Sequence, residues 1–471
     1  MVFSSTLFLF CFLPFTLIVY YLLDIKYRNV FLLLASLFFY AWGEPRFVII
    51  MIASILINYF CGLLIAYVKT RNKLLINRLV LILTVVLNLS FLFYFKYYNF
   101  FISTVDNILG LSISLKNIVL PIGISFFTFQ GMSYTLDLYL GKTQLQKNPI
   151  NIALYISLFP QLIAGPIVRY SDVNQQITGR VCSVDKFAEG VRRFVIGLSK
   201  KVIIANQLGY VADQVFSLPA NQNSVATAWA GIICYTFQIY FDFSGYSDMA
   251  IGLGKMFGFS FLENFNYPYI SKSIREFWRR WHISLSSWFK DYVYIPLGGN
   301  KKGNVYNNLL IVFFVTGLWH GAAWNFVVWG LWHGMFLIIE RVLAGKNKKI
   351  SLPSPVKLFY TIFVVVIGWV LFRSPDLKYA VEYLGIMFGV VKPVNVGFTV
   401  FWYLDRKVIT ILCVAVLTSI DWKSVFSERI KFMENKWSYI FAGNMSIIFL
   451  LLISIMMVVT STYNPFIYFR F

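Results

Sequence analysis

Residues 308–341 decide the fold of this chain, and they read NLLIVFFVTGLWHGAAWNFVVWGLWHGMFLIIER. As one straight helix these 34 residues would extend ~50 Å at ~1.5 Å per residue, well beyond the ~30 Å hydrocarbon core of a membrane. Gly317 and Gly321 bracket His320, so a break in the helix is predicted there. The break would leave His320 beside irregular backbone near the membrane centre.

The pentapeptide Gly-Leu-Trp-His-Gly occurs twice in this stretch and carries His320 and His333, two of the three histidines in the chain. Ionisable groups inside a membrane are costly and by default indicate function, which is the interpretation chosen for His320. His333 is only about two helical turns from the pair Glu340 and Arg341, which is expected near the membrane interface. A packing or hydrogen-bonding role is predicted for His333.

The composition predicts an all-α polytopic membrane protein. The chain is 59% hydrophobic with only 13% charged residues, and a soluble domain of this length would leave much of that apolar surface in water. Residues 2–23 lack a basic amino-terminal region and a cleavage site, so we expect a retained helix. A single domain is predicted over residues 1–471, with a short extracytoplasmic tail at 461–471. Apolar stretches long enough for most or all of a membrane span are residues 30–41, 47–68, 79–95, 361–372 and 446–459.

The net charge is +21, and the distribution of the basic residues is typical of a membrane protein rather than of a nucleic-acid-binding protein. Basic residues cluster between apolar stretches, as the positive-inside rule and anionic lipid favour for cytoplasmic loops. We therefore expect a multi-pass protein of the cell membrane with both termini extracytoplasmic. The five cysteines have neither metal nor disulfide spacing, so no metal site is predicted. The basic clusters are residues 69–73, 192–201, 290–302, 346–349 and 423–436.

The middle third departs from simple hydropathy. Residues 158–169, 240–254 and 261–269 mix Pro, Gly, Asp and Asn with aromatic residues. Such backbone is tolerated at membrane depth where it is buried in protein or lines a cavity. We expect a ring of ordinary spans around a thin centre of short, tilted or re-entrant helices.

Residues 277–300 combine aromatic and basic side chains around the third histidine. Trp278, His282 and Ser286 recur at helical spacing and would share one face. The segment has two interpretations, an amphipathic interfacial helix or a basic cytoplasmic entrance to His282 that suits the phosphates of a thioester donor. The basic side chains at this entrance are Arg275, Arg279 and Arg280.

Two acids, Asp242 and Asp248, flank Ser244 in a nearly apolar stretch. Acids in such segments normally have a partner. They would either orient a histidine or an arginine, or form buried ion pairs that hold the centre together.

The sequence has no Ser-His-Asp order, Gly-x-Ser-x-Gly elbow or phosphate-binding glycine loop. A single histidine suffices when the acyl donor is an activated thioester. The base then takes a proton from the incoming hydroxyl, and hydrogen-bond donors stabilise the oxyanion.

Residues 240–252, 277–299 and 317–324 resemble the membrane-bound O-acyltransferases. The stretch Asp-Tyr-Val-Tyr-Ile-Pro-Leu-Gly-Gly-Asn at 291–300 favours the branch that O-acetylates alginate and cell-wall polysaccharides. The resemblance implies that the essential histidine is His320, in its Leu-Trp-His-Gly motif, and that His282 is the second family histidine. The side chains expected to support the site are Trp319, Gly321, Asp242, Ser244, Asp248, Trp278 and Ser286.

The resemblance also implies a helical ring around a tunnel that crosses the membrane. A cytoplasmic acyl thioester, either acetyl-CoA or an acyl carrier, enters on one side, with no bound cofactor. On the other side the acyl group passes toward an extracytoplasmic glycan with the help of a secreted or membrane-anchored acetyltransferase.

The chain ends Pro-Phe-Ile-Tyr-Phe-Arg-Phe at 465–471. Aromatic residues after a last span are typical of an interfacial anchor. The ending is also similar to a Phe-Ile-Tyr-Phe-x-Phe terminal motif of this branch, in which the tyrosine is proposed to carry the acyl group. Tyr468 would then be an acyl relay.

The predicted function is transfer of an acyl group, acetyl in the first place, across the membrane for O-acetylation of an extracytoplasmic polysaccharide. One alternative is D-alanyl transfer from a carrier protein to teichoic acid. An alternative from another class is a transporter, since broken helices with polar groups at the midplane also suit transport.

Overall fold

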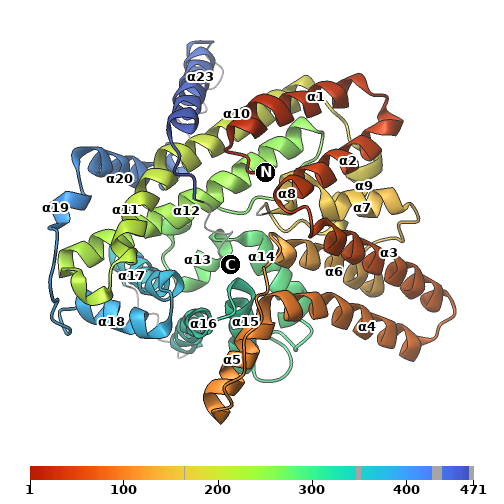
Figure 1. The fold of residues 1–471 in the computed structure, drawn as a ribbon. Helices are drawn as coiled ribbons and strands as arrows, with labels where there is room; N and C mark the ends of the chain where they lie inside the picture. Colours follow the sequence, from red (N-terminus) through yellow and green to blue (C-terminus); the bar gives the residue numbers. More distant parts are fainter. Residues whose placement is uncertain (164, 346–351, 427–436, 466–471) are drawn as a thin grey trace. The chain divides into compact units, whose positions relative to one another are not determined.

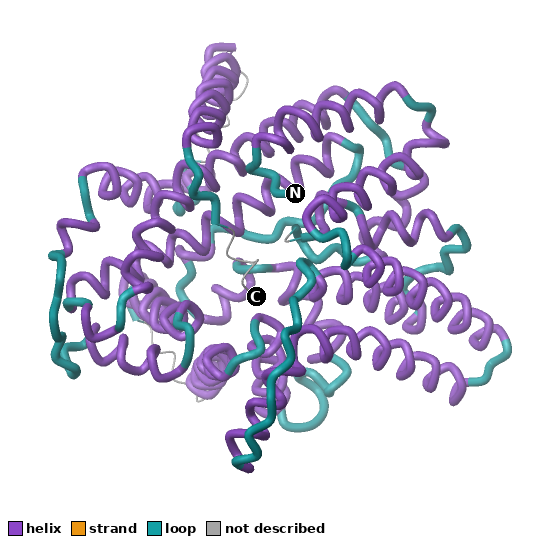
Figure 2. The backbone as a smooth tube through the Cα atoms, in the orientation of Figure 1, coloured by secondary structure: helices purple, strands orange, loops and turns teal. Residues whose placement is uncertain are grey.

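The computed structural model describes residues 1–163, 165–345, 352–426 and 437–465. These residues form helices joined by loops, and no strand occurs among them (Figure 2). The helices group into two compact units. Unit 1 comprises Met1–Phe194 and Met249–Leu262, and unit 2 comprises Val195–Asp248 and Glu263–Phe471.

Five helices in the described part of the chain are long and apolar enough to cross a membrane. They confirm the prediction of a polytopic protein, and four of them coincide with predicted spans to within one residue or contain them. The expected spans at residues 2–23 and 30–41 are also helical, although neither is among these five. The five are Val48–Thr70, Leu74–Leu109, Trp324–Ala344, Ser354–Arg373 and Ile440–Thr460.

Unit 1 holds the amino-terminal helices, drawn in red to yellow in Figure 1. Buried polar contacts join α3 to α4, since the Asn58 amide donates to Asn88 Oδ1 at 2.9 Å. Its helices are α1 (Leu13–Leu22), α2 (Ile25–Gly43), α3 (Val48–Thr70), α4 (Leu74–Leu92), α5 (Tyr98–Leu109), α6 (Ile124–Leu140), α7 (Pro149–Ser157), α8 (Phe159–Leu162), α9 (Tyr170–Gly179) and most of α10 (Val184–Ser199).

Unit 2 holds all the residues of the candidate site. Its helices are η3 (Lys200–Ala205), α11 (Asn206–Ser217), most of α12 (Val225–Met256), α13 (Ile274–Arg280), α14 (Ile283–Phe289), η6 (Lys290–Tyr294), α15 (Val305–His320), α16 (Trp324–Gly345), α17 (Ser354–Arg373), α18 (Leu377–Met387), α19 (Val400–Tyr403), α20 (Arg406–Thr418), α21 (Trp422–Val425) and α23 (Trp437–Thr460). Within this unit α23 projects from its neighbours (Figure 1).

The helix break predicted at the first pentapeptide is confirmed. Helix α15 ends at His320 and α16 begins at Trp324, and the two lie side by side (Figure 1). Glycines allow this close packing, because a Cβ atom at Gly317 would lie against the carbonyl oxygen of Phe326 and one at Gly330 against that of Phe313. The glycines of both pentapeptides therefore bring His320 to a tight helix–helix junction.

Two local expectations were wrong. Residues 240–254 belong to the long helix α12 rather than to a short or irregular one, because their polar side chains are buried and paired within protein. Residues 277–289 do not form one helix with Trp278, His282 and Ser286 on one face. The helix stops after Arg280, and His282 has a positive φ of 43° before α14 begins.

Two of the three stretches in the middle third have irregular backbone, whereas the thin centre within the membrane remains a prediction. The described part of residues 158–169 contains the four-residue helix α8 between irregular segments, and residues 261–267 form an irregular loop before a 3₁₀ turn at Pro268–Ile270. The through-membrane tunnel, the re-entrant arrangement and the single-domain organisation remain predictions.

Candidate active site

His320 is the last residue of α15 and is almost fully buried. Three aromatic rings surround its imidazole, with ring centroids at 4.9 Å for Trp319, 4.9 Å for Trp329 and 5.3 Å for Phe372. Phe326 lies against the backbone of Gly321, where a Cβ atom would meet its ring. The predicted catalytic histidine therefore lies in an aromatic enclosure built from α15, α16 and α17.

His282 is also fully buried, and the Asn264 side chain fixes its orientation. Asn264 Oδ1 lies 3.0 Å from His282 Nδ1 and accepts a hydrogen bond from the Ser284 hydroxyl at 2.8 Å, while Asn264 Nδ2 donates to the Ser247 hydroxyl at 3.0 Å. Because the amide oxygen can only accept, His282 Nδ1 carries the proton and Nε2 keeps its lone pair. Nε2 has no hydrogen-bond partner among the described residues.

Asn264 also explains the break between α13 and α14. The backbone carbonyl oxygen of Asn264 accepts from Ile283 N at 2.9 Å, and its side-chain Oδ1 accepts from Ser284 N at 3.3 Å. The first N–H groups of a helix need such acceptors. Asn264 therefore provides the acceptors for the first N–H groups of α14, and its side chain also holds His282, the residue before that helix.

The indole of Trp319 contacts both predicted catalytic histidines. Its ring centroid is 6.0 Å from that of His282 and 4.9 Å from that of His320. The structure thus brings together the two histidines that the sequence places 38 positions apart.

His333 lies in an aromatic cluster, consistent with its predicted packing role. Its ring contacts Phe277 at 6.2 Å, Trp278 at 5.2 Å and Trp329 at 5.3 Å between centroids. Trp329 therefore stands between the histidines of the two pentapeptides.

Asp242 and Asp248 form ion pairs with the consecutive lysines of η3. Lys201 Nζ lies 2.6 Å from Asp242 Oδ1, with both side chains 2% exposed, and Lys200 Nζ lies 2.7 Å from Asp248 Oδ2. These contacts agree with the interpretation of the two acids as members of ion pairs.

Lys200 and Lys201 were assigned from sequence to a basic loop cluster. That assignment was wrong, because both lysines are helical and paired with acids. Ser244 is buried on the same helix, α12.

A first cavity, here called the basic cavity, has a volume of about 200 Å³. Arg275, Arg279 and Lys290 contribute its cationic groups, and Trp278 and Ser286 line it as well. The remaining lining is largely apolar and comes from α14, η6, α15 and α16.

Two of the three arginines expected at the basic entrance, Arg275 and Arg279, line this cavity. A cytoplasmic opening and a route to His282 remain predictions. Arg280 does not line the basic cavity, because its side chain binds Glu276 at 3.0 Å and the carbonyl oxygen of Asn266 at 3.1 Å. Lys290 was not singled out from sequence, although it belongs to a basic cluster.

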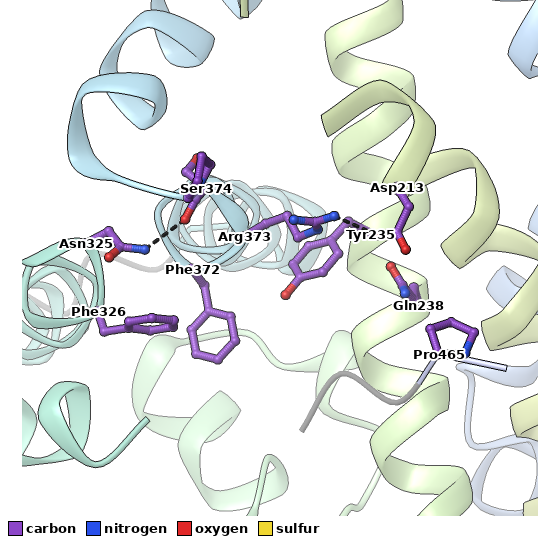
Figure 3. Close-up of a pocket in the computed structure, with 10 residues that line it drawn as sticks. Asp213, Tyr235, Gln238, Asn325, Phe326, Phe372, Arg373, Ser374 and Pro465 are labelled. Atoms are coloured by element: carbon purple, nitrogen blue, oxygen red, sulfur yellow. Dashed lines mark hydrogen bonds and ion pairs between the residues drawn. The ribbon is translucent and has the colours of Figure 1, made fainter. Parts of the chain in front are cut away.

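A second cavity, here called the tail-side cavity, has a volume of about 220 Å³ (Figure 3). Arg373 on one wall pairs with Asp213 at 2.6 Å, and Asn325 donates to the Ser374 carbonyl at 2.9 Å. Phe372 and Phe326 form an aromatic wall, and Phe372 is the ring that contacts His320. The remaining lining residues are Tyr235, Gln238, Pro375 and Pro465.

The chain after α23 reaches this second cavity. The Tyr463 hydroxyl donates to Asp213 Oδ2 at 2.8 Å, and its ring contacts Tyr210 with centroids 5.5 Å apart. Lys201 Nζ donates to the carbonyl oxygen of Pro465. Tyr468, the predicted relay residue, lies outside the described residues.

Several residues of this site were missed from sequence alone. Asn264, Trp329 and Lys201 act through contacts between elements that are distant along the chain. Asn264 falls in residues 261–269, and the mixture of polar and aromatic residues there was its only sequence signal.

Comparison with known proteins identifies the class. The model of the membrane-bound O-acyltransferase family matches residues 146–372. The chain is 43% identical over 498 aligned positions to a probable alginate O-acetylase of Pseudomonas putida, with 100% of both chains covered. It is 37% identical to the peptidoglycan O-acetyltransferase of Helicobacter pylori, over 83% of this chain and 80% of that protein.

A third relative is the teichoic acid D-alanyltransferase of Bacillus subtilis, which is 32% identical over 53% of this chain and 66% of that protein. The chain belongs to the membrane-bound O-acyltransferase family. It is a multi-pass membrane enzyme that transfers acyl groups to oxygen, as the sequence motifs predicted.

Proposed function

We propose that this protein transfers an acetyl group from a cytoplasmic thioester to an extracytoplasmic acceptor, for O-acetylation of a polysaccharide. The observation that carries the proposal is the position of His320. Its aromatic enclosure includes Trp329, which contacts the basic-cavity residue Trp278, and Phe372, which lines the tail-side cavity.

The basic cavity is the proposed donor site. Its arginines and lysine suit the phosphates of coenzyme A or of a carrier-bound phosphopantetheine arm, since charge-assisted hydrogen bonds to phosphate are among the strongest in proteins. Its apolar walls suit the uncharged part of that arm. Donor binding there would point the thioester toward Trp278 and the enclosure beyond it.

His320 is the proposed general base. The acceptor hydroxyl attacks the thioester carbonyl carbon while His320 takes the hydroxyl proton. Collapse of the tetrahedral intermediate breaks the carbon–sulfur bond, and the imidazolium returns the proton to the departing thiolate. One ester and one thiol result from one thioester and one hydroxyl.

His282 is the proposed positioning residue. Its Nδ1–H is committed to Asn264, so Nε2 can only accept a hydrogen bond. A substrate hydroxyl or amide N–H would be held by that nitrogen beside Trp319. This assignment is a proposal that rests on the fixed tautomer.

The tail-side cavity is the proposed acceptor side, and Tyr468 is the proposed acyl relay. Tyr468 is three residues beyond Pro465, and three extended residues span at most about 10 Å. Pro465 already lines the cavity whose Phe372 contacts His320. The Tyr468 hydroxyl would accept the acetyl group and pass it to a secreted or membrane-anchored acetyltransferase.

The names of the relatives supply the acceptor class. Alginate and peptidoglycan are both polysaccharides, and both relatives with these names match at least 83% of this chain. The relative named for D-alanyl transfer matches 53%. A polysaccharide O-acetylation role is therefore proposed ahead of D-alanylation.

The test uses the purified protein in lipid nanodiscs. Labelled acetyl-CoA, acetyl carrier protein and D-alanyl carrier protein are supplied separately, and released thiol and acylated product are measured. We expect turnover of an acetyl thioester. Turnover of the D-alanyl carrier alone would replace the proposal with D-alanylation, and turnover of none of the three would contradict the proposed donor chemistry.

A further inference from the structure

Two tryptophans separate the basic cavity from His320. Trp278 lines the cavity and contacts Trp329 with ring centroids 5.8 Å apart. Trp329 in turn contacts His320 at 4.9 Å. Ring contacts therefore connect the basic cavity to His320 through Trp278 and then Trp329.

The space around Trp329 is filled by other rings. Trp329 is 0% exposed, and its ring centroid lies 4.9 Å from Phe372, 5.3 Å from His333 and 6.1 Å from Trp369. Trp278 is similarly enclosed on one side by Phe313 at 5.1 Å. Trp329 is therefore held between rings, whereas Trp278 borders the basic cavity on its open side.

The backbone behind these rings is also closely packed. A Cβ atom at Gly330, next to Trp329, would meet the carbonyl oxygen of Phe313, and one at Gly368 would lie 2.9 Å from His333 Nε2. Protein interiors of this density respond to a change of even one methylene. Close packing of both side chains and backbone therefore separates the basic cavity from His320.

The same rings carry polar groups that suit a carbonyl. Trp278 Nε1, Trp329 Nε1 and both ring nitrogens of His333 are buried and have no hydrogen-bond partner among the described residues. A buried donor without an acceptor costs free energy. A thioester carbonyl oxygen is an acceptor that these N–H groups would fit.

We propose that Trp278 and Trp329 set the length of the acyl group that reaches His320, admitting a two-carbon group and rejecting longer chains. This inference rests on the proposed function, and it names the specificity determinant of that same site. The two indoles close the path sterically and their N–H groups orient the carbonyl. One excess methylene in a tight pocket changes discrimination by about 10- to 200-fold.

The experiment compares acetyl-CoA with butyryl-CoA in the full-length protein in nanodiscs. The measured quantity is the ratio of kcat/KM for butyryl transfer to kcat/KM for acetyl transfer. This ratio should rise by at least about 10-fold in Trp329→Leu and in Trp278→Leu, because each change opens the path. Trp329→Phe, the smaller change, should shift the ratio in the same direction while preserving an aromatic ring.

Trp332→Leu is the matched control. Trp332 lies on the same helix, but its indole donates to the Val364 carbonyl at 2.9 Å and packs on Phe336. The butyryl to acetyl ratio should stay unchanged in this variant. Folding is checked by size-exclusion elution and thermal unfolding.

An unchanged ratio in folded Trp329→Phe, Trp329→Leu and Trp278→Leu would overturn the length gate while leaving acetyl transfer intact. A wild-type protein that consumes neither thioester would instead contradict the proposed function, and the gate with it. Equal use of both thioesters by the wild type would refute the gate alone.

Discussion

At the scale of single residues, one amide determines the chemistry available at His282. Asn264 accepts from His282 Nδ1 and from Ser284, and it donates to Ser247. A fourth contact excludes the flipped amide, because Asn264 Oδ1 accepts from the Ser284 backbone N–H at 3.3 Å and Nδ2 could not accept there. The imidazole therefore keeps its lone pair on Nε2.

Asn264→Ala should lower kcat/KM by roughly 10- to 100-fold, since a lost acceptor for a buried donor costs about 1–3 kcal/mol. Steady-state thioester turnover measures the effect. Asn266→Ala, two positions away and exposed, is the control and should behave as wild type. Equal activity of the two variants would show that the tautomer of His282 does not matter.

Some of these residue roles could be predicted from sequence and others could not. His320 was identifiable because glycines flank it and a single helix would exceed the membrane thickness. Asn264 and Trp329 were missed because their roles arise from contacts with residues on other elements. Lys201 was misassigned because charge clustering alone does not distinguish a solvated loop from a buried ion pair.

At the scale of elements, α13 presents its basic residues on different faces. Arg275 and Arg279 line the basic cavity, whereas Arg280 binds Glu276 and the Asn266 carbonyl. The i, i+4 spacing already places Arg275 and Arg279 on one helix face. The sequence could not show that Arg280 binds the Asn266 carbonyl, because that contact comes from a separate segment.

Replacing Arg275 and Arg279 together with Ala should raise the apparent KM for acetyl-CoA by about 10-fold, consistent with the loss of a charge-assisted contact to phosphate. The difference from wild type should shrink at high ionic strength, because salt screens exposed charges. Arg280→Ala supplies the comparison and should change KM far less. A larger effect from Arg280 would argue against the basic cavity as donor site.

The packing of α15 on α16 depends on small residues. Gly330→Ala should lower the thermal unfolding temperature in detergent, since overpacking typically costs about 1–3 kcal/mol. Gly443→Ala, in α23, meets nothing within 4 Å and should be neutral or slightly stabilising. Equal unfolding temperatures for both variants would contradict the close approach of the two helices.

At the scale of the whole molecule, hydropathy predicted the class of fold, and the family motifs predicted the class of enzyme. Four of the five long apolar helices overlap predicted spans. The long helix α12 was not predicted, because hydropathy scores its acids as unfavourable and cannot anticipate Lys200 and Lys201 as their partners. The direction of transfer and the extracytoplasmic position of both termini remain predictions.

Tyr468→Phe separates the two interpretations of the tail. The substitution keeps the ring, and with it any anchoring to the membrane interface, but removes the oxygen that would carry acetyl. We expect loss of polysaccharide acetylation in cells with normal protein level. Tyr210→Phe, which removes the hydroxyl of an exposed tyrosine, should have no effect. Wild-type acetylation in Tyr468→Phe would leave the tail as an anchor only.

The most direct test of the account is acetyl-CoA turnover by His320→Gln and His320→Ala in nanodiscs. Loss of a general base should reduce kcat by on the order of 10²–10⁴-fold, with a near-normal KM because the donor cavity is intact. Both variants should elute like the wild type, and His320→Gln, which is closer in size, should also unfold like it. Turnover near the wild-type rate in either folded variant would contradict the assignment of His320 as the base.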